Sequence, residues 1–75
     1  MSAHLTVKFA KHISLERVAG MASSIAAYGN VWPGATDREF SVEVFRVAKL
    51  PRLKQRLAEW EPHGFLTWAE VENSN

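Results

Sequence analysis

The sequence predicts an α+β two-layer sandwich, because it alternates between two kinds of hydrophobic periodicity. Short segments with a period of two indicate strands, and two longer segments with helical spacing indicate amphipathic helices. Their order along the 75 residues is strand, helix, strand, strand, helix, strand. In that order each helix can cross over between parallel strands in the right-handed sense, which places both helices on one face of a four-stranded antiparallel sheet.

The first strand is expected near Leu5 to Ala10, where apolar residues alternate with His4, Thr6 and Lys8. A helix follows, and Ser14 has the character of its N-cap. Ile13 and Val18 are spaced as a hydrophobic staple around that cap. Gly29 is expected to end the helix in the left-handed conformation.

The second half of the chain predicts a hairpin, a helix and a last strand. The hairpin spans residues 31–47, with a first arm shortened by Pro33 and Gly34 and a second arm in which Phe40, Val42 and Val44 point inward. Pro51 suits the first turn of the second helix, and a last strand runs over residues 65–72. Together these elements predict the ferredoxin-like arrangement in one domain, residues 1–72, with residues 73–75 as a frayed tail. The alternative loses the strand at Val31 and keeps a three-stranded β-α-β-α-β sheet.

Composition favours a small folded protein without covalent staples. The chain is 47% hydrophobic, has no cysteine and carries a net charge of +1, which argues against disorder, disulfides and thiolate metal sites. We see neither a signal peptide nor a membrane-spanning stretch, so we expect a soluble, cytoplasmic protein. Domains of this size often gain stability from a second subunit.

No motif predicts catalysis, a metal or a cofactor. His4, His12 and His63 lack metal-ligand spacing, the serines lack the pattern of a nucleophile elbow, and the four glycines form no phosphate-binding loop. We therefore expect a protein that is not an enzyme and that has no catalytic, cofactor-binding or metal-binding residues.

An open sheet face and an exposed edge strand are the expected binding surfaces. Because Glu70 and Glu72 should avoid the core, the alternation of the last strand predicts that Leu66 and Trp68 also face away from the helices. The expected partner-binding residues are Trp32, Phe45, Val47, Leu66 and Trp68. The last strand should also lie at a sheet edge, and it contains no proline or lysine that would discourage pairing with a further strand.

A basic block precedes an acidic one. The five cations are Arg46, Lys49, Arg52, Lys54 and Arg56. Cations in the first turn of a helix oppose its dipole, so folding alone does not explain them, and an anionic partner would. The strand containing Phe40 and Phe45 shares features with the third strand of RNA-recognition motifs, but Glu39, Val42 and Glu43 depart from that pattern, and we do not assign the family.

Two functions follow as hypotheses. The first is a protein-binding module, such as a small regulator or a phage-encoded inhibitor of host machinery, whose partner is another protein or a second copy that forms a homodimer. The second is a nucleic-acid-binding protein that uses the basic second helix. Neither involves a membrane, and the sequence leaves the partner's identity open.

Overall fold

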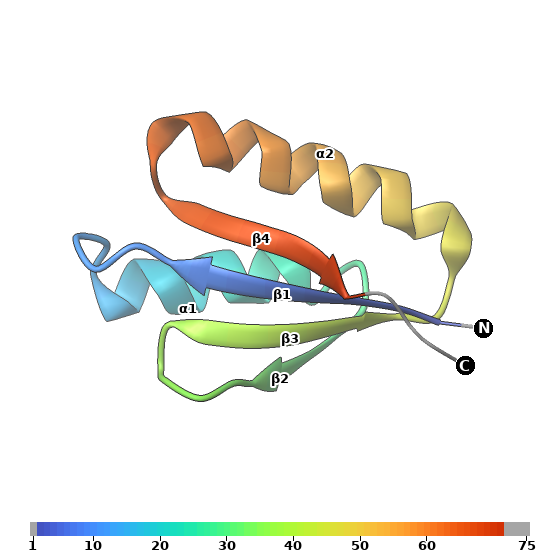
Figure 1. Ribbon diagram of the computed structural model, residues 1–75, viewed down its shortest axis with the longest axis horizontal. Helices are drawn as coiled ribbons and strands as arrows, with labels where there is room; N and C mark the ends of the chain where they lie inside the picture. The colour runs from blue at the N-terminus through green and yellow to red at the C-terminus, as the bar shows by residue number, and fades with distance from the viewer. Residues whose placement is uncertain (1, 72–75) are drawn as a thin grey trace.

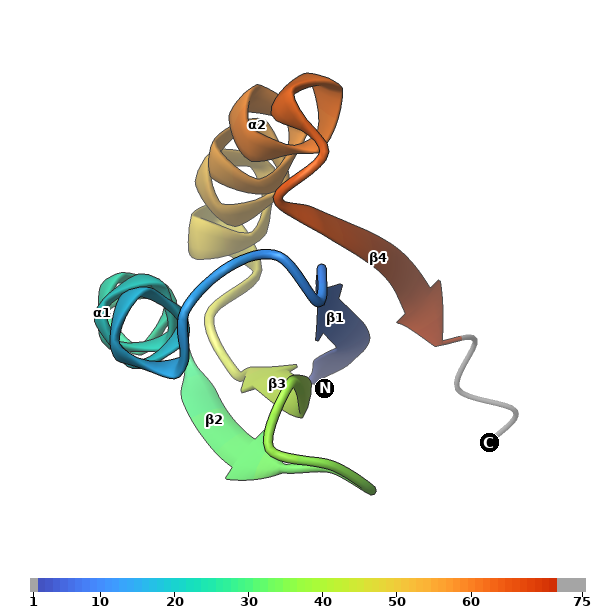
Figure 2. The same cartoon turned by 90° about the vertical axis from the view of Figure 1, so that its left-hand side faces the viewer.

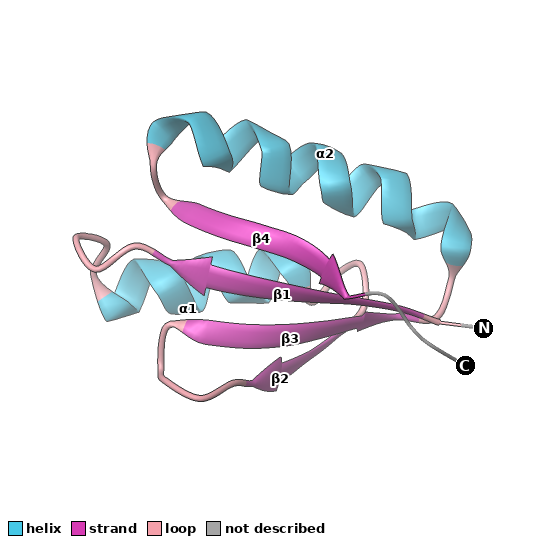
Figure 3. Cartoon of the chain, viewed as in Figure 1, coloured by secondary structure: helices cyan, strands magenta, loops and turns pink. Residues whose placement is uncertain are grey.

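Six main elements follow one another in the computed structural model, which describes residues 2–71 (Figures 1 and 3). They are β1 (Ala3–Phe9), α1 (Leu15–Ile25), β2 (Asn30–Pro33), β3 (Glu39–Val44), α2 (Leu50–Trp60) and β4 (Leu66–Val71). The order is the predicted one. The expected tail at residues 73–75 and the expected end of the last strand at Glu72 lie outside the described residues.

The four strands form one antiparallel sheet in the order β2-β3-β1-β4. Both helices lie on the same side of this curved sheet (Figure 2), which gives the predicted α+β sandwich. The three-stranded alternative is wrong, because Asn30–Pro33 pairs with β3 despite the proline at its end. The order makes β2 and β4 the two edges of the sheet.

The core lies between the sheet and the helices. Its buried members are Leu5, Val7, Phe9, Ile13, Val18, Ile25, Val42, Val44, Leu53, Leu57 and Leu66. The alternating residues of β1 and β3 point inward as predicted, with Phe40 partly buried against this cluster. The opposite side of the sheet faces away from both helices.

Helix α1 begins as expected and ends earlier. The Ser14 hydroxyl accepts a hydrogen bond from the Arg17 backbone N–H at 3.2 Å, which is the predicted N-cap. The expected left-handed cap at Gly29 is wrong, because the helix ends at Ile25 and Gly64 (φ 73°) is the only residue of positive φ in the described part of the chain. Gly29 is required for another reason, since a Cβ there would collide with the backbone carbonyl of Glu43.

The turn that precedes β3 is fastened to the loop that follows β1. The Arg38 guanidinium donates through Nη1 to the carbonyl of Ala10 at 2.9 Å and to the carbonyl of Ile13 at 2.5 Å. These contacts join segments more than 20 positions apart in the sequence. They fix the end of the sheet at which the chain enters α1.

Candidate functional site

Strand β4 presents the opposite face from the one expected. Its register places Leu66 beside Phe9, Trp68 beside Val7 and Glu70 beside Leu5. Directly paired residues of antiparallel strands lie on the same face of the sheet, so these three side chains point toward the helices. Leu66 is only 3% exposed. The prediction that Leu66 and Trp68 lie on the open face is therefore wrong.

The error came from the assumption that Glu70 avoids the helix side. On that side Glu70 meets Lys54 of α2, and the Nζ to Oε1 distance is 2.7 Å. Because β4 is an edge strand, its helix-facing side near Glu70 remains open to solvent, and a carboxylate can lie there without being desolvated. The ion pair also neutralises the only charge on the strand itself between Leu66 and Val71.

The backbone of β4 has one side free for pairing. The Ala10 N–H donates to the Phe65 carbonyl at 2.9 Å, so this opposed pair is hydrogen-bonded. Hydrogen-bonded and non-bonded pairs alternate along antiparallel strands, and therefore Thr67, Ala69 and Val71 direct their N–H and C=O groups toward β1. The corresponding groups of Leu66, Trp68 and Glu70 point to the free edge.

At the other edge, strand β2 is blocked. The Gly34 N–H donates to the Glu39 carbonyl at 2.8 Å, so by the same alternation Asn30 and Trp32 direct their backbone groups toward β3. The outward positions are Val31 and Pro33. Proline has no N–H to donate, and the strand is only four residues long. Within residues 2–71 the sheet thus has one protected edge, β2, and one edge, β4, to which no further strand is paired.

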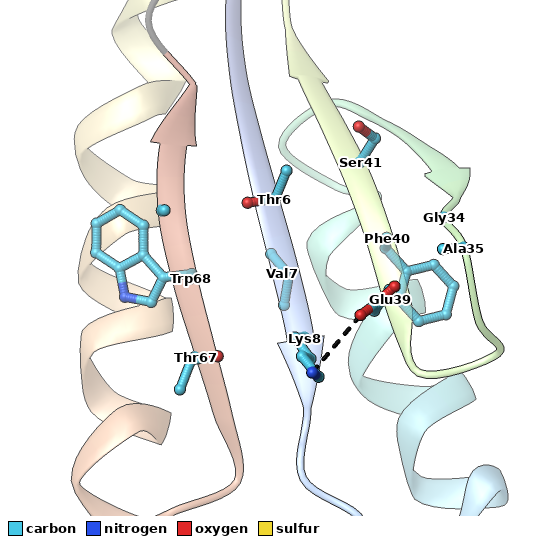
Figure 4. A pocket seen from close by; sticks show the side chains of 11 residues that line it. Thr6, Val7, Lys8, Gly34, Ala35, Glu39, Phe40, Ser41, Thr67 and Trp68 are labelled. Carbon is cyan, nitrogen blue, oxygen red and sulfur yellow. Dashed lines mark ion pairs between the residues drawn. The ribbon is translucent and has the colours of Figure 1, made fainter.

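The side chain of Trp68 lies at this available edge. In Figure 4 the indole projects from β4 on the side away from β1. The ring is partly buried against the core, and its Nε1 is buried without a hydrogen-bond partner among the described residues. The edge therefore combines free backbone groups with aromatic surface.

The open face of the sheet is polar at its centre. Thr6 and Ser41 lie side by side there, between the ion pairs Lys8–Glu39 (3.7 Å) and His4–Glu43 (3.6 Å). A shallow hollow of about 560 Å³ lies over this region and reaches Gly34 in the β2–β3 turn (Figure 4). Its charges are already paired across the strands, so the face offers no concentrated charge to a ligand.

Three of the predicted partner-binding residues are exposed. Trp32 on β2 is 54% exposed, Phe45 just after β3 is 58% exposed and Val47 is 65% exposed. Val47 lies outside the sheet, in a 3₁₀ turn spanning Val47–Lys49, because β3 ends at Val44. The expected continuous patch is therefore divided, with Phe45 and Val47 beyond the end of β3 and Trp32 on the edge strand β2.

Two cations of the predicted basic block have internal partners. Lys49 donates to the carbonyl of Ala27 at 3.3 Å, just beyond the end of α1, where the helix dipole favours a positive charge. Lys54 is paired with Glu70. Both cations therefore have a partner within the fold, and the expectation that they bind an anionic partner stays a prediction.

The other cations are more exposed. Arg56 lies 3.9 Å from Glu59 and over the ring of Trp60. Arg46 and Arg52 are exposed, and neither makes an ion pair within residues 2–71. Arg52 and Arg56 line a polar hollow of about 310 Å³ together with Tyr28, which follows α1. This side of α2 is distinct from the side on which Lys54 reaches β4.

Searches for relatives give no assignment: no family model, curated protein or solved structure matches this chain. No helix within residues 2–71 has the length and apolar character needed to span a membrane. The same residues contain no group of three or more His, Asp or Glu side chains placed to hold a metal ion.

Proposed function

We propose that this chain is a small, non-enzymatic protein-binding module that adds a strand of its partner to the free edge of β4. The observation that carries the proposal is the unequal protection of the two edges. Pro33 removes an outward donor from β2, whereas Leu66, Trp68 and Glu70 of β4 leave their N–H and C=O groups unpaired by β1. Main-chain hydrogen bonds provide affinity in this mode of recognition, and alternate side chains provide specificity.

The surroundings of the edge favour an uncharged, extended segment. The Glu70 carboxylate is held by Lys54, and the outward face of β4 carries Thr67 and Ala69. Natural edges are commonly guarded by lysine, proline or inward-pointing charges. Strand β4 has no lysine or proline, and its one inward-pointing charge, Glu70, is paired with Lys54. A regulator or inhibitor that binds an extended segment of another protein by strand addition would use such an edge.

The experiment is selection of a randomised heptapeptide library, displayed on particles, against the purified chain. Proline at position 70 removes an outward N–H without breaking the ladder to β1, so we expect the selected peptides to bind wild type and Glu70→Ala and to lose at least tenfold in affinity for Glu70→Pro. Glu70→Ala is the matched control, because both variants lose the ion pair. Trp32→Ala tests whether the selected peptides contact the open face of the sheet instead of the β4 edge. Absence of enrichment at a concentration at which the chain is monomeric, or peptides that bind Glu70→Pro as well as wild type, would contradict the proposal.

A second candidate is nucleic-acid binding by α2, favoured by the exposed guanidinium groups of Arg46, Arg52 and Arg56. It is the weaker candidate because the net charge is only +1 and because Lys49 and Lys54 have partners within the fold.

A further inference from the structure

We infer that the segment added to β4 belongs to a second copy of this chain, which pairs β4 with β4 antiparallel about a twofold axis at Trp68. This inference rests on the proposed function, since it names the occupant of the same edge. Within residues 66–71 the free backbone groups are those of Leu66, Trp68 and Glu70, so a pairing centred on Trp68 joins all of them to their counterparts. A twofold interface uses the same surface on both subunits, so the pairing joins two sheets of order β2-β3-β1-β4 through their β4 edges.

Charge disfavours a register shifted toward Glu70. With Trp68 at the axis, Glu70 of one copy lies opposite Leu66 of the other, and the two carboxylates fall at opposite ends of the pairing. A register centred on Glu70 would place the carboxylates directly opposite each other, which is unfavourable. The register centred on Trp68 also engages all three free residues of each copy.

The helix layer is compatible with a second copy at this edge. Lys54 marks the side of α2 that faces β4, and positions three before and four after it lie on the same side of a helix. Those positions are Pro51 and Ala58, both exposed and uncharged. The exposed Arg52 and Arg56 lie toward Tyr28 instead. The guanidinium groups of Arg52 and Arg56 in the two copies would therefore not meet at the axis.

Trp68 supplies apolar surface where the two copies would meet. Its indole projects beyond β4 on the side away from β1 (Figure 4), and in this register the two indoles flank the axis. A chain of 75 residues buries a smaller fraction of its surface on folding than a larger domain does. Small domains often gain additional buried surface by forming oligomers.

The first test is the solution mass across a concentration series, measured by light scattering after gel filtration. We expect wild type and Glu70→Ala to approach twice the monomer mass of 8.4 kDa, and Glu70→Pro to remain at the monomer mass while its circular dichroism shows a folded chain. A wild type that stays monomeric up to millimolar concentration would overturn the inference, and so would a Glu70→Pro variant that dimerises as wild type does. If peptides selected against the β4 edge still bind a monomeric chain, only the identity of the occupant is refuted and the proposed function survives.

The second test fixes the register by disulfide cross-linking, which is clean because the chain has no cysteine of its own. In the inferred register Thr67 of one copy lies opposite Ala69 of the other in a non-hydrogen-bonded pair, where Cα atoms are roughly 4.5 Å apart, within the range a disulfide spans. A mixture of Thr67→Cys and Ala69→Cys chains should form a mixed dimer on oxidation at least tenfold faster than either chain alone forms a dimer. Equal rates, or cross-linking by a single variant alone, would overturn the register.

Discussion

Lys54 of α2 and Glu70 of β4 form an ion pair of 2.7 Å that ties the second helix to the edge of the sheet. This contact accounts for a carboxylate on the helix-facing side of β4 and for a cation in the first half of α2. It also leaves the β4 edge without a free charge. One of the cations expected to bind an anionic partner, Lys54, is thus engaged within the fold.

Replacement of either partner of this pair should destabilise the chain only slightly. Both side chains are more than a third exposed, at 40% and 38%, and exposed ion pairs contribute about 0.2–1 kcal/mol. We expect Lys54→Met and Glu70→Gln each to lower the free energy of unfolding by less than about 1 kcal/mol. Urea denaturation of both single variants and of the double variant measures the coupling, and a coupling well above that range would show that the pair is more shielded than its exposure indicates.

The orientation of β4 predicts unequal effects at two adjacent residues. Leu66→Ala removes a buried side chain and should lower the free energy of unfolding by about 2–5 kcal/mol. Thr67→Ala changes an exposed residue on the opposite face and should stay within roughly 0.5 kcal/mol of wild type. Thermal or chemical denaturation measures the free energy of unfolding of both variants. Similar losses for Leu66→Ala and Thr67→Ala would mean that the strand is not oriented as described.

Two glycines should respond to alanine in opposite directions. At Gly20, within α1, an added Cβ meets no atom within 4 Å, so Gly20→Ala should raise the free energy of unfolding by about 0.4–1 kcal/mol. At Gly29 an added Cβ would collide with the Glu43 carbonyl on β3, and Gly29→Ala should be destabilising by about 1–3 kcal/mol. The melting temperatures of both variants provide the measurement. A neutral Gly29→Ala would mean that the turn after α1 can move away from β3.

Removal of the Arg38 side chain should loosen the end of the sheet next to α1. Its guanidinium supplies two hydrogen bonds to carbonyls of the β1–α1 loop, and hydrogen bonds to a charged group contribute about 1.5–3 kcal/mol each. We expect Arg38→Ala to lower the free energy of unfolding by at least about 1 kcal/mol, with faster amide exchange in residues 10–13. Its exposed neighbour serves as the control, since Asp37→Ala should leave both quantities close to wild type. Unchanged exchange in the loop would contradict the role assigned to Arg38.

The nucleic-acid hypothesis predicts a steep response to salt. If Arg46, Arg52 and Arg56 neutralise phosphates, the logarithm of the association constant should fall linearly with the logarithm of salt concentration, by about 0.7 per phosphate contact on a single strand. Fluorescence anisotropy with a labelled 20-nucleotide single-stranded RNA, and Arg52→Ala as the variant, measures this slope. We expect no binding above 100 mM salt, because our first candidate is protein binding. Tight, salt-dependent binding that Arg52→Ala weakens would make nucleic-acid binding the first candidate and protein binding the second.

Local patterns predicted the elements well where each pattern had a local cause. The alternation in β1 and β3, the Ser14 N-cap and Pro51 in the first turn of α2 all depend on neighbours within a few residues, and all are present in the structure. The failures at Gly29 and Val47 concern where an element stops. Tertiary contacts decide those limits, such as the close approach of Gly29 to the Glu43 carbonyl.

The sequence by itself determined the order of the elements, their crossover arrangement and the edge position of β4, because hydrophobic periodicity and helix-terminal residues act locally. Only the tertiary structure decided which face of β4 meets the helices and which cations have partners. An alternating strand can satisfy its apolar residues on either face when it lies at an edge. Burial of Leu66 in the core decided the choice, and Lys54, which is 16 positions from Glu70 in the sequence, accommodates the Glu70 carboxylate only when α2 packs beside β4.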